Sequence, residues 1–314
     1  MTSQTPADNS VDPRLRRRAL ALLVVSPLFF SSNLIIGRAA AQTVEPSTLA
    51  FWRWLIAFMI LLPFAFSGLR KHRATLLAHA GELVVLGFLG MTLCGSLIYV
   101  ALKSTTATNA TLIYTSSPVL IVLLEWLFRG IRPGARQMLG IALAFAGVAT
   151  ILMKGDIDRL IHFRFNPGDI GVAVGALAWA VYSVILRRKH FTSLPTIVLF
   201  CAIAGTGAAI LAPFMAYEAI RLDAFPRTQE AWMSILGVAV FASVLAFSTF
   251  QYGVKTVGPS IAGVFMYLLP VYGVSLAVLF LGERVQAFHL AGFAGVATGV
   301  ALTTLPKGLF RRRT

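Results

Sequence analysis

The sequence predicts an all-α integral membrane protein with ten transmembrane helices in a 5+5 inverted-topology repeat. Three observations predict this class. The 314-residue chain is 57% hydrophobic and 12% charged, with a mean hydropathy of +0.79, whereas a soluble domain is typically about 45–50% apolar and about 25% charged. The apolar residues gather in ten long runs, and the two halves of the chain resemble each other.

A transmembrane helix needs about 20 predominantly apolar residues. We predict spans at 19–41, 47–67, 82–102, 106–128, 134–153, 168–186, 195–217, 231–254, 259–281 and 286–305. The corresponding divisions are a basic cytoplasmic tail at 1–18, a first five-helix repeat at 19–153, an extracytoplasmic loop at 154–167, a second repeat at 168–305 and a basic tail at 306–314.

The first apolar run has a second interpretation. Arg14–Arg18, the apolar run and the alanines at 39–41 resemble a secretory signal peptide with its cleavage site. The run is long for that purpose, and its Leu28–Arg38 part mirrors Leu177–Arg187 in the second half. We therefore expect it to remain as the first transmembrane helix.

The internal repeat is a shift of 152 residues without a gap, which places 103–149 on 255–301 with 16 identities in 47 positions. Apolar chains match one another easily by chance, but hydrophobicity does not explain aligned Pro, Gly and Arg residues. Pro118 matches Pro270, and Arg132 matches Arg284. A duplicated membrane half is typical of transporters, in which two related halves move around a site between them.

The distribution of Lys and Arg predicts the orientation. With the N-terminus in the cytoplasm, 18 of the 27 Lys and Arg residues fall in cytoplasmic segments, 7 in external loops and 2 within spans. Because cytoplasmic loops carry the excess of positive charge, we expect an inner (plasma) membrane protein with both termini in the cytoplasm. These charges flank apolar runs, so the net charge of +15 does not indicate a nucleic-acid partner.

Motifs for enzymatic chemistry are absent from the sequence. It contains neither a GxxxxGK[ST] motif nor a Gly-x-Ser-x-Gly elbow. The five histidines lie at span edges or in loops, and none forms a ligand pair at helical spacing. We expect no catalytic residue, metal or cofactor. An intramembrane enzyme is the alternative of another class, and it would require clustered nucleophiles, acids or metal ligands within spans.

Several segments resemble EamA-type members of the drug/metabolite transporter superfamily. Leu28–Arg38 resembles the opening of the first span in that family, and Pro46–Arg53 resembles the entry to the second. The strongest match runs from Ala262 to Gly299 and includes the element Leu281–Arg284. The resemblance covers about residues 19–305. The first half departs from the pattern, because Arg129–Arg132 replaces the expected Gly-Glu-Arg element.

Within the superfamily, the chain looks most like amino-acid and metabolite exporters, including the YddG-like exporters of aromatic amino acids. The resemblance implies a small-molecule substrate that moves outward through a central cavity by alternating access. A transporter of drugs or of sugar-phosphate-like metabolites is the alternative. A phosphate carrier would require several cationic residues in the cavity, and only Arg38 and Arg53 are available within the spans.

Polar and aromatic residues within the spans are the candidate substrate-binding residues. Neutral hydrogen-bonding groups beside aromatic rings suit a zwitterion with an apolar or aromatic side chain, although interhelical hydrogen bonds and interfacial aromatic belts explain part of such a set. Arg53 is the candidate anchor for a carboxylate, with snorkelling or pairing with Glu45 as the alternative. The set is Asn33, Arg53, Tyr99, Tyr114, Trp179, Tyr182, Gln251, Tyr252 and Tyr267.

Helix breaks and one ion pair are also predicted. Pro118 and Pro270 lie in the middle of equivalent spans, where each removes a backbone hydrogen bond and kinks its helix. Such bends flank central sites in transporters, although they also serve packing alone. Glu125, the most deeply placed acid, is expected to pair with Arg129 one turn further on.

Glycines recur in the fifth and tenth spans, at Gly140, Gly147, Gly292, Gly295 and Gly299. Small residues of this kind allow helices to approach closely within a bilayer. We therefore expect these two spans to lie away from the substrate pathway. The predicted assembly within the lipid bilayer is a monomer or a homodimer formed through spans five and ten.

Overall fold

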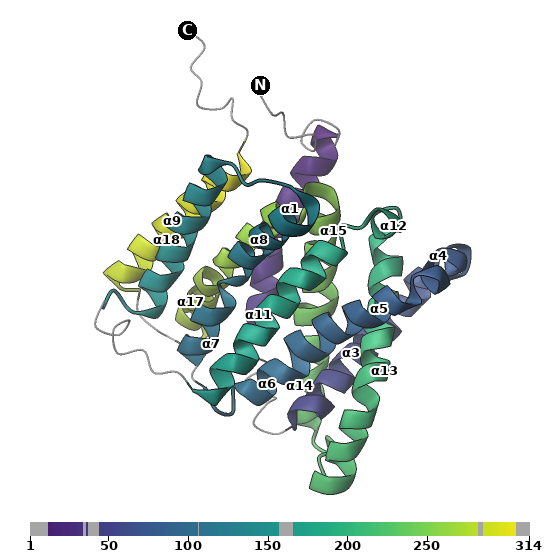
Figure 1. Cartoon of the computed structure of the whole chain (residues 1–314). Coiled ribbons are helices and arrows are strands. Elements are labelled where there is room, and N and C mark those ends of the chain that lie inside the picture. Colours follow the sequence, from purple (N-terminus) through teal and green to yellow (C-terminus); the bar gives the residue numbers. More distant parts are fainter. Residues whose placement is uncertain are drawn as a thin grey trace.

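The computed structural model describes residues 12–33, 36, 44–105, 107–156, 166–281 and 285–305. In this part of the chain every regular element is a helix (Figure 1). Among the described residues, nine helical segments of 18–29 residues are long and apolar enough to span a membrane. The predicted all-α membrane class is therefore confirmed, and the chain is a multi-pass membrane protein.

The first helix, α1 (Pro13–Ser32), lies in the middle of the bundle (Figure 1). The side chain of Asp12 caps it by accepting a hydrogen bond from the Arg14 N–H at 2.8 Å. α1 is not one of the nine apolar segments, because arginines crowd its first two turns. Residues 34–35 and 37–41 of the predicted first span lie outside the described part of the chain.

Two helix pairs form opposite edges of the bundle (Figure 1). One edge holds α3 (Pro46–Lys71) against α13 (Thr196–Leu222), and the other holds α9 (Ala135–Leu152) against α18 (Ala287–Thr304). The glycines of α9 and α18 face each other, since a Cβ added to Gly147 would lie 2.6 Å from the Gly292 carbonyl oxygen. A homodimer through these helices would have to use their other faces, and it stays a prediction.

Two spans contain π-helical segments in their middle. The first is built from α5 (Ala80–Gly87), the π-helical η2 (Phe88–Ser96) and α6 (Leu97–Ala101). The second is built from α14 (Gln229–Gly237), the π-helical η3 (Val238–Leu245) and α15 (Ala246–Val257). Wide turns of this kind occur frequently at functional sites, because they redirect the side chains that follow.

Two further spans are interrupted. One consists of α7 (Ala107–Tyr114) and α8 (Ser117–Arg129), separated by a two-residue turn. The other consists of α16 (Pro259–Val264), the 3₁₀ segment η4 (Phe265–Tyr267) and α17 (Leu268–Leu281). Pro118 and Pro270 lie in the first turns of α8 and α17, directly after the interruptions. A gating role for these prolines stays a prediction.

The second half of the chain begins with α11 (Pro167–Ile185). The Asp169 carboxylate accepts a hydrogen bond from the Asn166 N–H at 2.7 Å and another from the Thr105 hydroxyl, which ties the start of α11 to the segment after α6. Two short helices, α4 (Arg73–Ala78) and α12 (Lys189–Thr192), lie in connections between longer ones.

Two buried carboxylates cap helices of the opposite half. Glu218 of α13 accepts hydrogen bonds from the backbone N–H groups of Ser47 and Thr48, at 3.0 and 2.7 Å, and from the Thr48 hydroxyl at 2.9 Å. Glu125 of α8 accepts from the Ser260 N–H at 3.1 Å and from the Ser260 hydroxyl. Glu125 also pairs with Arg129 at 2.6 Å, so the predicted ion pair is confirmed.

Candidate functional site

An aromatic cluster fills the centre of the bundle. Its middle is Phe247 of α15, whose ring centroid lies 4.9 Å from that of Trp54 and 5.8 Å from that of Phe200. The rings come from five helices, α1, α3, α11, α13 and α15, and therefore from both halves of the chain. The aromatic cluster comprises Phe30, Trp54, Trp179, Tyr182, Phe200, Phe247 and Phe250.

Arg53 of α3 is the charged group beside this cluster. It is 5% exposed, and its guanidinium lies 4.7 Å from the centre of the Trp54 ring. Its N–H groups donate to the Ser243 hydroxyl at 2.6 Å, the Tyr99 hydroxyl at 3.0 Å and the Ala242 carbonyl at 3.0 Å. All three acceptors are electrically neutral. Two of them belong to the π-helical η3.

The Arg53 contacts exclude one of the alternatives that the sequence left open for this residue. Pairing of Arg53 with Glu45 is wrong, because Glu45 instead binds Lys103 at 2.6 Å. Within the described part of the chain, no carboxylate pairs with Arg53. The network also extends to Asn33, whose side-chain oxygen accepts a hydrogen bond from the Tyr99 hydroxyl at 2.9 Å. Three of the predicted binding residues therefore form one hydrogen-bonded chain.

A second group of predicted residues also lies beside Phe247, whose ring centroid is 5.5 Å from that of Trp179 and 6.3 Å from that of Tyr182. Trp179 and Tyr182 of α11 stack with ring centroids 5.6 Å apart, and Gln251 donates through Nε2 to the Tyr182 hydroxyl at 2.8 Å. Tyr182 fits closely against η2, since a Cβ on Gly90 would lie 2.9 Å from its ring. All three side chains are buried, and they belong to helices of the second half.

Several buried polar atoms in this region lack a hydrogen-bond partner among the described residues. They are the indole N–H groups of Trp54 and Trp179, the Tyr267 hydroxyl and Gln251 Oε1. A buried polar group left unsatisfied costs about 1–3 kcal/mol. Such groups are rare in native proteins, and each calls for an explanation.

The other predicted binding residues divide into two groups. Tyr114 of α7 lies beside Cys94 and within electrostatic range of Arg53, and Tyr267 of η4 is fully buried in the main hydrophobic core. Tyr252 is not brought to the centre. Its ring lies 5.6 Å from the Arg18 guanidinium, near the start of α1, on a different face of α15 from Gln251.

The structure also assembles a cluster that the sequence did not indicate. The possible ligand atoms of His79, Glu82 and His190 lie within 4.8 Å of one another, and the two imidazole rings stack at 3.8 Å. The Arg188 guanidinium lies 2.9 Å from the same Glu82 oxygen that His190 contacts at 3.1 Å. This positive charge opposes a bound cation, so we assign no metal to the cluster.

Comparison with known proteins defines the class of this chain. The model of the EamA-like transporter family matches residues 17–153 and again residues 166–305. Together these matches cover most of the chain, which therefore belongs to the EamA-like transporter family. The chain is accordingly a membrane transporter of the drug/metabolite transporter superfamily.

Several relatives that match nearly the whole length of this chain are named as transporters. An uncharacterized transporter of Archaeoglobus fulgidus is 30% identical over 291 residues, covering 90% of this chain and 96% of its own. The uncharacterized transporter YyaM of Bacillus subtilis is 28% identical, covering 91% and 94%. The uncharacterized inner membrane transporter YedA of Escherichia coli K12 is 25% identical, covering 90% and 89%.

A solved crystal structure shares the fold. It matches with a TM-score of 0.71 at 23% identity, covering 91% of this chain and 97% of the solved one. The names of the relatives do not state a substrate. A substrate class therefore has to be inferred from Arg53, the aromatic cluster and the polar groups around them.

Proposed function

We propose that this protein exports amino acids, including aromatic ones, by alternating access through the centre of the bundle. The transport unit is a 5+5 inverted repeat in which α1 provides the tenth span. Both termini are cytoplasmic, in an inner membrane. The paired π-helical segments and the paired interruptions before Pro118 and Pro270 support two structurally related halves.

The observation that carries the substrate class is the environment of Arg53. A guanidinium in the membrane interior is costly, and the three side-chain and backbone groups that hold Arg53 bring no negative charge. A substrate carboxylate would supply that charge. Because guanidinium and carboxylate match in geometry and form bidentate pairs, Arg53 suits an amino acid better than a neutral solute.

The unpartnered polar atoms fit the remainder of such a substrate. The indole N–H groups of Trp54 and Trp179 are donors for carboxylate oxygens, and Gln251 Oε1 is an acceptor for an ammonium group. The faces of the aromatic cluster offer stacking partners for an aromatic side chain. A single bound amino acid would therefore satisfy both indole donors and the Gln251 acceptor at the same time.

The tight packing of the aromatic cluster supports transport by alternating access. Trp54, Tyr182, Phe200 and Phe250 are 0% exposed, so a substrate reaches them only when helices of the two halves separate. The cluster is built from both halves, and motion of one half against the other would open it. Arg53 is bound to η3 of the second half, so this contact would be exchanged during transport.

Uptake into liposomes containing the purified protein tests the proposal. A panel of labelled amino acids is compared with the matching amines, which lack the carboxylate. Because Arg53→Gln removes the charge but keeps hydrogen-bond donors, it should raise the apparent KM for amino acids by about ten- to hundredfold. The amines should be affected least, and Arg53→Lys should retain partial transport.

The matched control is Arg70→Gln, which removes a charge from an exposed arginine of the same helix. This variant should transport like the wild type. If Arg53→Gln lowers only the thermal stability and leaves the kinetics unchanged, Arg53 is a structural residue and the amino-acid assignment is wrong.

A further inference from the structure

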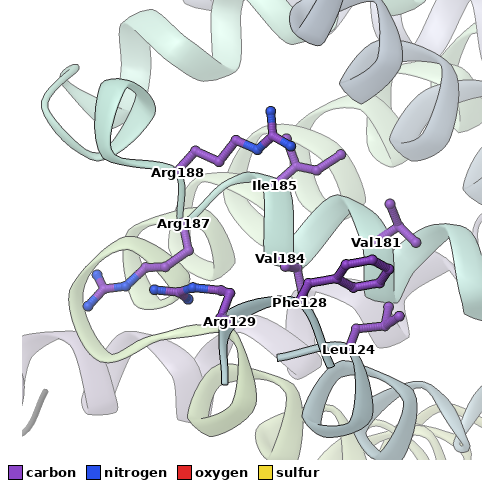
Figure 2. Close-up of a pocket in the computed structure, with 8 residues that line it drawn as sticks. All are labelled: Leu124, Phe128, Arg129, Val181, Val184, Ile185, Arg187 and Arg188. Atoms are coloured by element: carbon purple, nitrogen blue, oxygen red, sulfur yellow. The ribbon is translucent and has the colours of Figure 1, made fainter. Parts of the chain in front are cut away.

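A pocket of about 410 Å³ lies between the end of α8 and the end of α11, and none of its lining residues belongs to the aromatic cluster (Figure 2). Its apolar wall consists of Leu124, Phe128, Val181, Val184 and Ile185. Its polar rim consists of Arg129, Arg187 and Arg188. The guanidinium groups of Arg129 and Arg187 lie on the same side of the pocket in Figure 2.

The rim carries more positive charge than its partners neutralise. Arg129 pairs with Glu125, and Arg188 pairs with Glu82. Arg187 donates to the carbonyl oxygen of Lys255, and no carboxylate pairs with it within the described ranges. Burial, together with the neighbouring Arg129 charge, lowers the pKa of Arg187 from its ordinary value. An anion bound in the pocket would offset the excess positive charge of the rim.

The apolar wall faces the surroundings of the bundle. Phe128 is 73% exposed and its neighbour Leu127 is 70% exposed, as expected for side chains that contact lipid in a multi-pass protein. The Arg188 side chain is 55% exposed at the end of α11. The pocket is therefore apolar where the bundle meets the hydrocarbon, and basic where it meets the headgroup layer.

We propose that this pocket binds an anionic phospholipid. The phosphate accepts hydrogen bonds from Arg187, the rim arginine that pairs with no carboxylate among the described residues, and one acyl chain lies along the apolar wall. Arginine binds phosphate through two parallel hydrogen bonds, and basic pockets between membrane helices on the cytoplasmic side hold anionic headgroups. Because α8 and α11 belong to different halves, the lipid contacts both halves at once.

Native mass spectrometry of the purified, delipidated full-length protein tests this proposal. The protein in neutral detergent is titrated with dioleoylphosphatidylglycerol or with dioleoylphosphatidylcholine, and bound lipid is counted. The wild type should retain the anionic lipid at about tenfold lower concentration than the zwitterionic lipid. Arg187→Gln should weaken retention of the anionic lipid by about ten- to hundredfold, as expected for losing charge-assisted hydrogen bonds.

Two further variants separate the pocket from general surface charge. Arg132→Gln removes the same charge from an exposed arginine that does not line the pocket, and it should bind lipid like the wild type. Val184→Trp keeps every charge but fills the apolar wall, so it should weaken retention as Arg187→Gln does. Val184→Trp also serves as the test if Arg187→Gln fails to fold.

Three outcomes would overturn the proposal. The first is equal retention of the two lipids by the wild type. The second is an equal loss in Arg187→Gln and Arg132→Gln, which would indicate unspecific attraction to the basic surface. The third is displacement of the lipid by inorganic phosphate at equal concentration, which would identify a site for small anions instead.

Discussion

The capping of α3 by Glu218 can be tested through protein stability. Glu218→Ala removes the acceptor of three hydrogen bonds, two from the backbone N–H groups of Ser47 and Thr48 and one from the Thr48 hydroxyl. Because Glu218 is 9% exposed, water replaces these bonds poorly. Loss of a buried acceptor costs about 1–3 kcal/mol for each group left unpaired, and loss of a cap costs about 0.5–2 kcal/mol.

We therefore expect Glu218→Ala to destabilise the protein by roughly 2–5 kcal/mol, which corresponds to a fall in melting temperature of roughly 5–15 °C. Glu218→Gln keeps one carbonyl acceptor, so its melting temperature should fall less than that of Glu218→Ala. The assay is thermal unfolding of the purified protein in detergent, followed by tryptophan fluorescence.

Glu230→Ala is the control for Glu218→Ala. Glu230 lies in the first turn of α14 and is exposed, so its interaction with the helix dipole contributes about 0.3–1 kcal/mol. Equal melting temperatures for Glu218→Ala and Glu230→Ala would refute the assignment of Glu218 as a buried cap.

Three other predictions concern packing, topology and transport. Gly147→Ala should destabilise the protein by about 1–3 kcal/mol, because its Cβ would lie 2.6 Å from a backbone oxygen of α18; Gly81→Ala, which meets nothing within 4 Å, should be neutral or stabilising in thermal unfolding. In a background without native cysteines, an impermeant thiol reagent applied to intact cells should label Asp223→Cys and spare Lys71→Cys, and the reverse pattern would invert the proposed orientation. Trp179→Ala should reduce amino-acid uptake into liposomes when uptake is normalised to the amount of folded protein, and full activity on that basis would remove Trp179 from the proposed pathway.

Features that depend on neighbouring residues were predictable from the sequence. Glu125 and Arg129 are one helical turn apart, so any helix through them allows the pair to form. The lengths of the apolar runs predicted a multi-pass helical protein. The interruptions before Pro118 and Pro270 follow from the missing N–H and the fixed ring of proline.

Contacts between distant segments were not predictable. The Arg53 guanidinium meets Ser243, 190 residues further along the chain, and His190 meets Glu82 across 108 residues. Tyr252 shows a different limit, because adjacent residues of a helix point about 100° apart. The spacing of polar residues in α15 did not reveal that Gln251 binds Tyr182 whereas Tyr252 contacts Arg18.

Reciprocal capping has a consequence for the biogenesis of the chain. The N-terminus of α3 is completed by Glu218, a residue synthesised 171 positions after Ser47. The N-terminus of α16 is completed by Glu125, which is already in the membrane when Ser260 emerges. During translation, the start of α3 therefore lacks its capping carboxylate until Glu218 has been synthesised. The start of α16, in contrast, finds its capping carboxylate, Glu125, already inserted. Each half supplies a buried carboxylate that caps a helix of the other half, but only the second half has its cap available as soon as it is inserted.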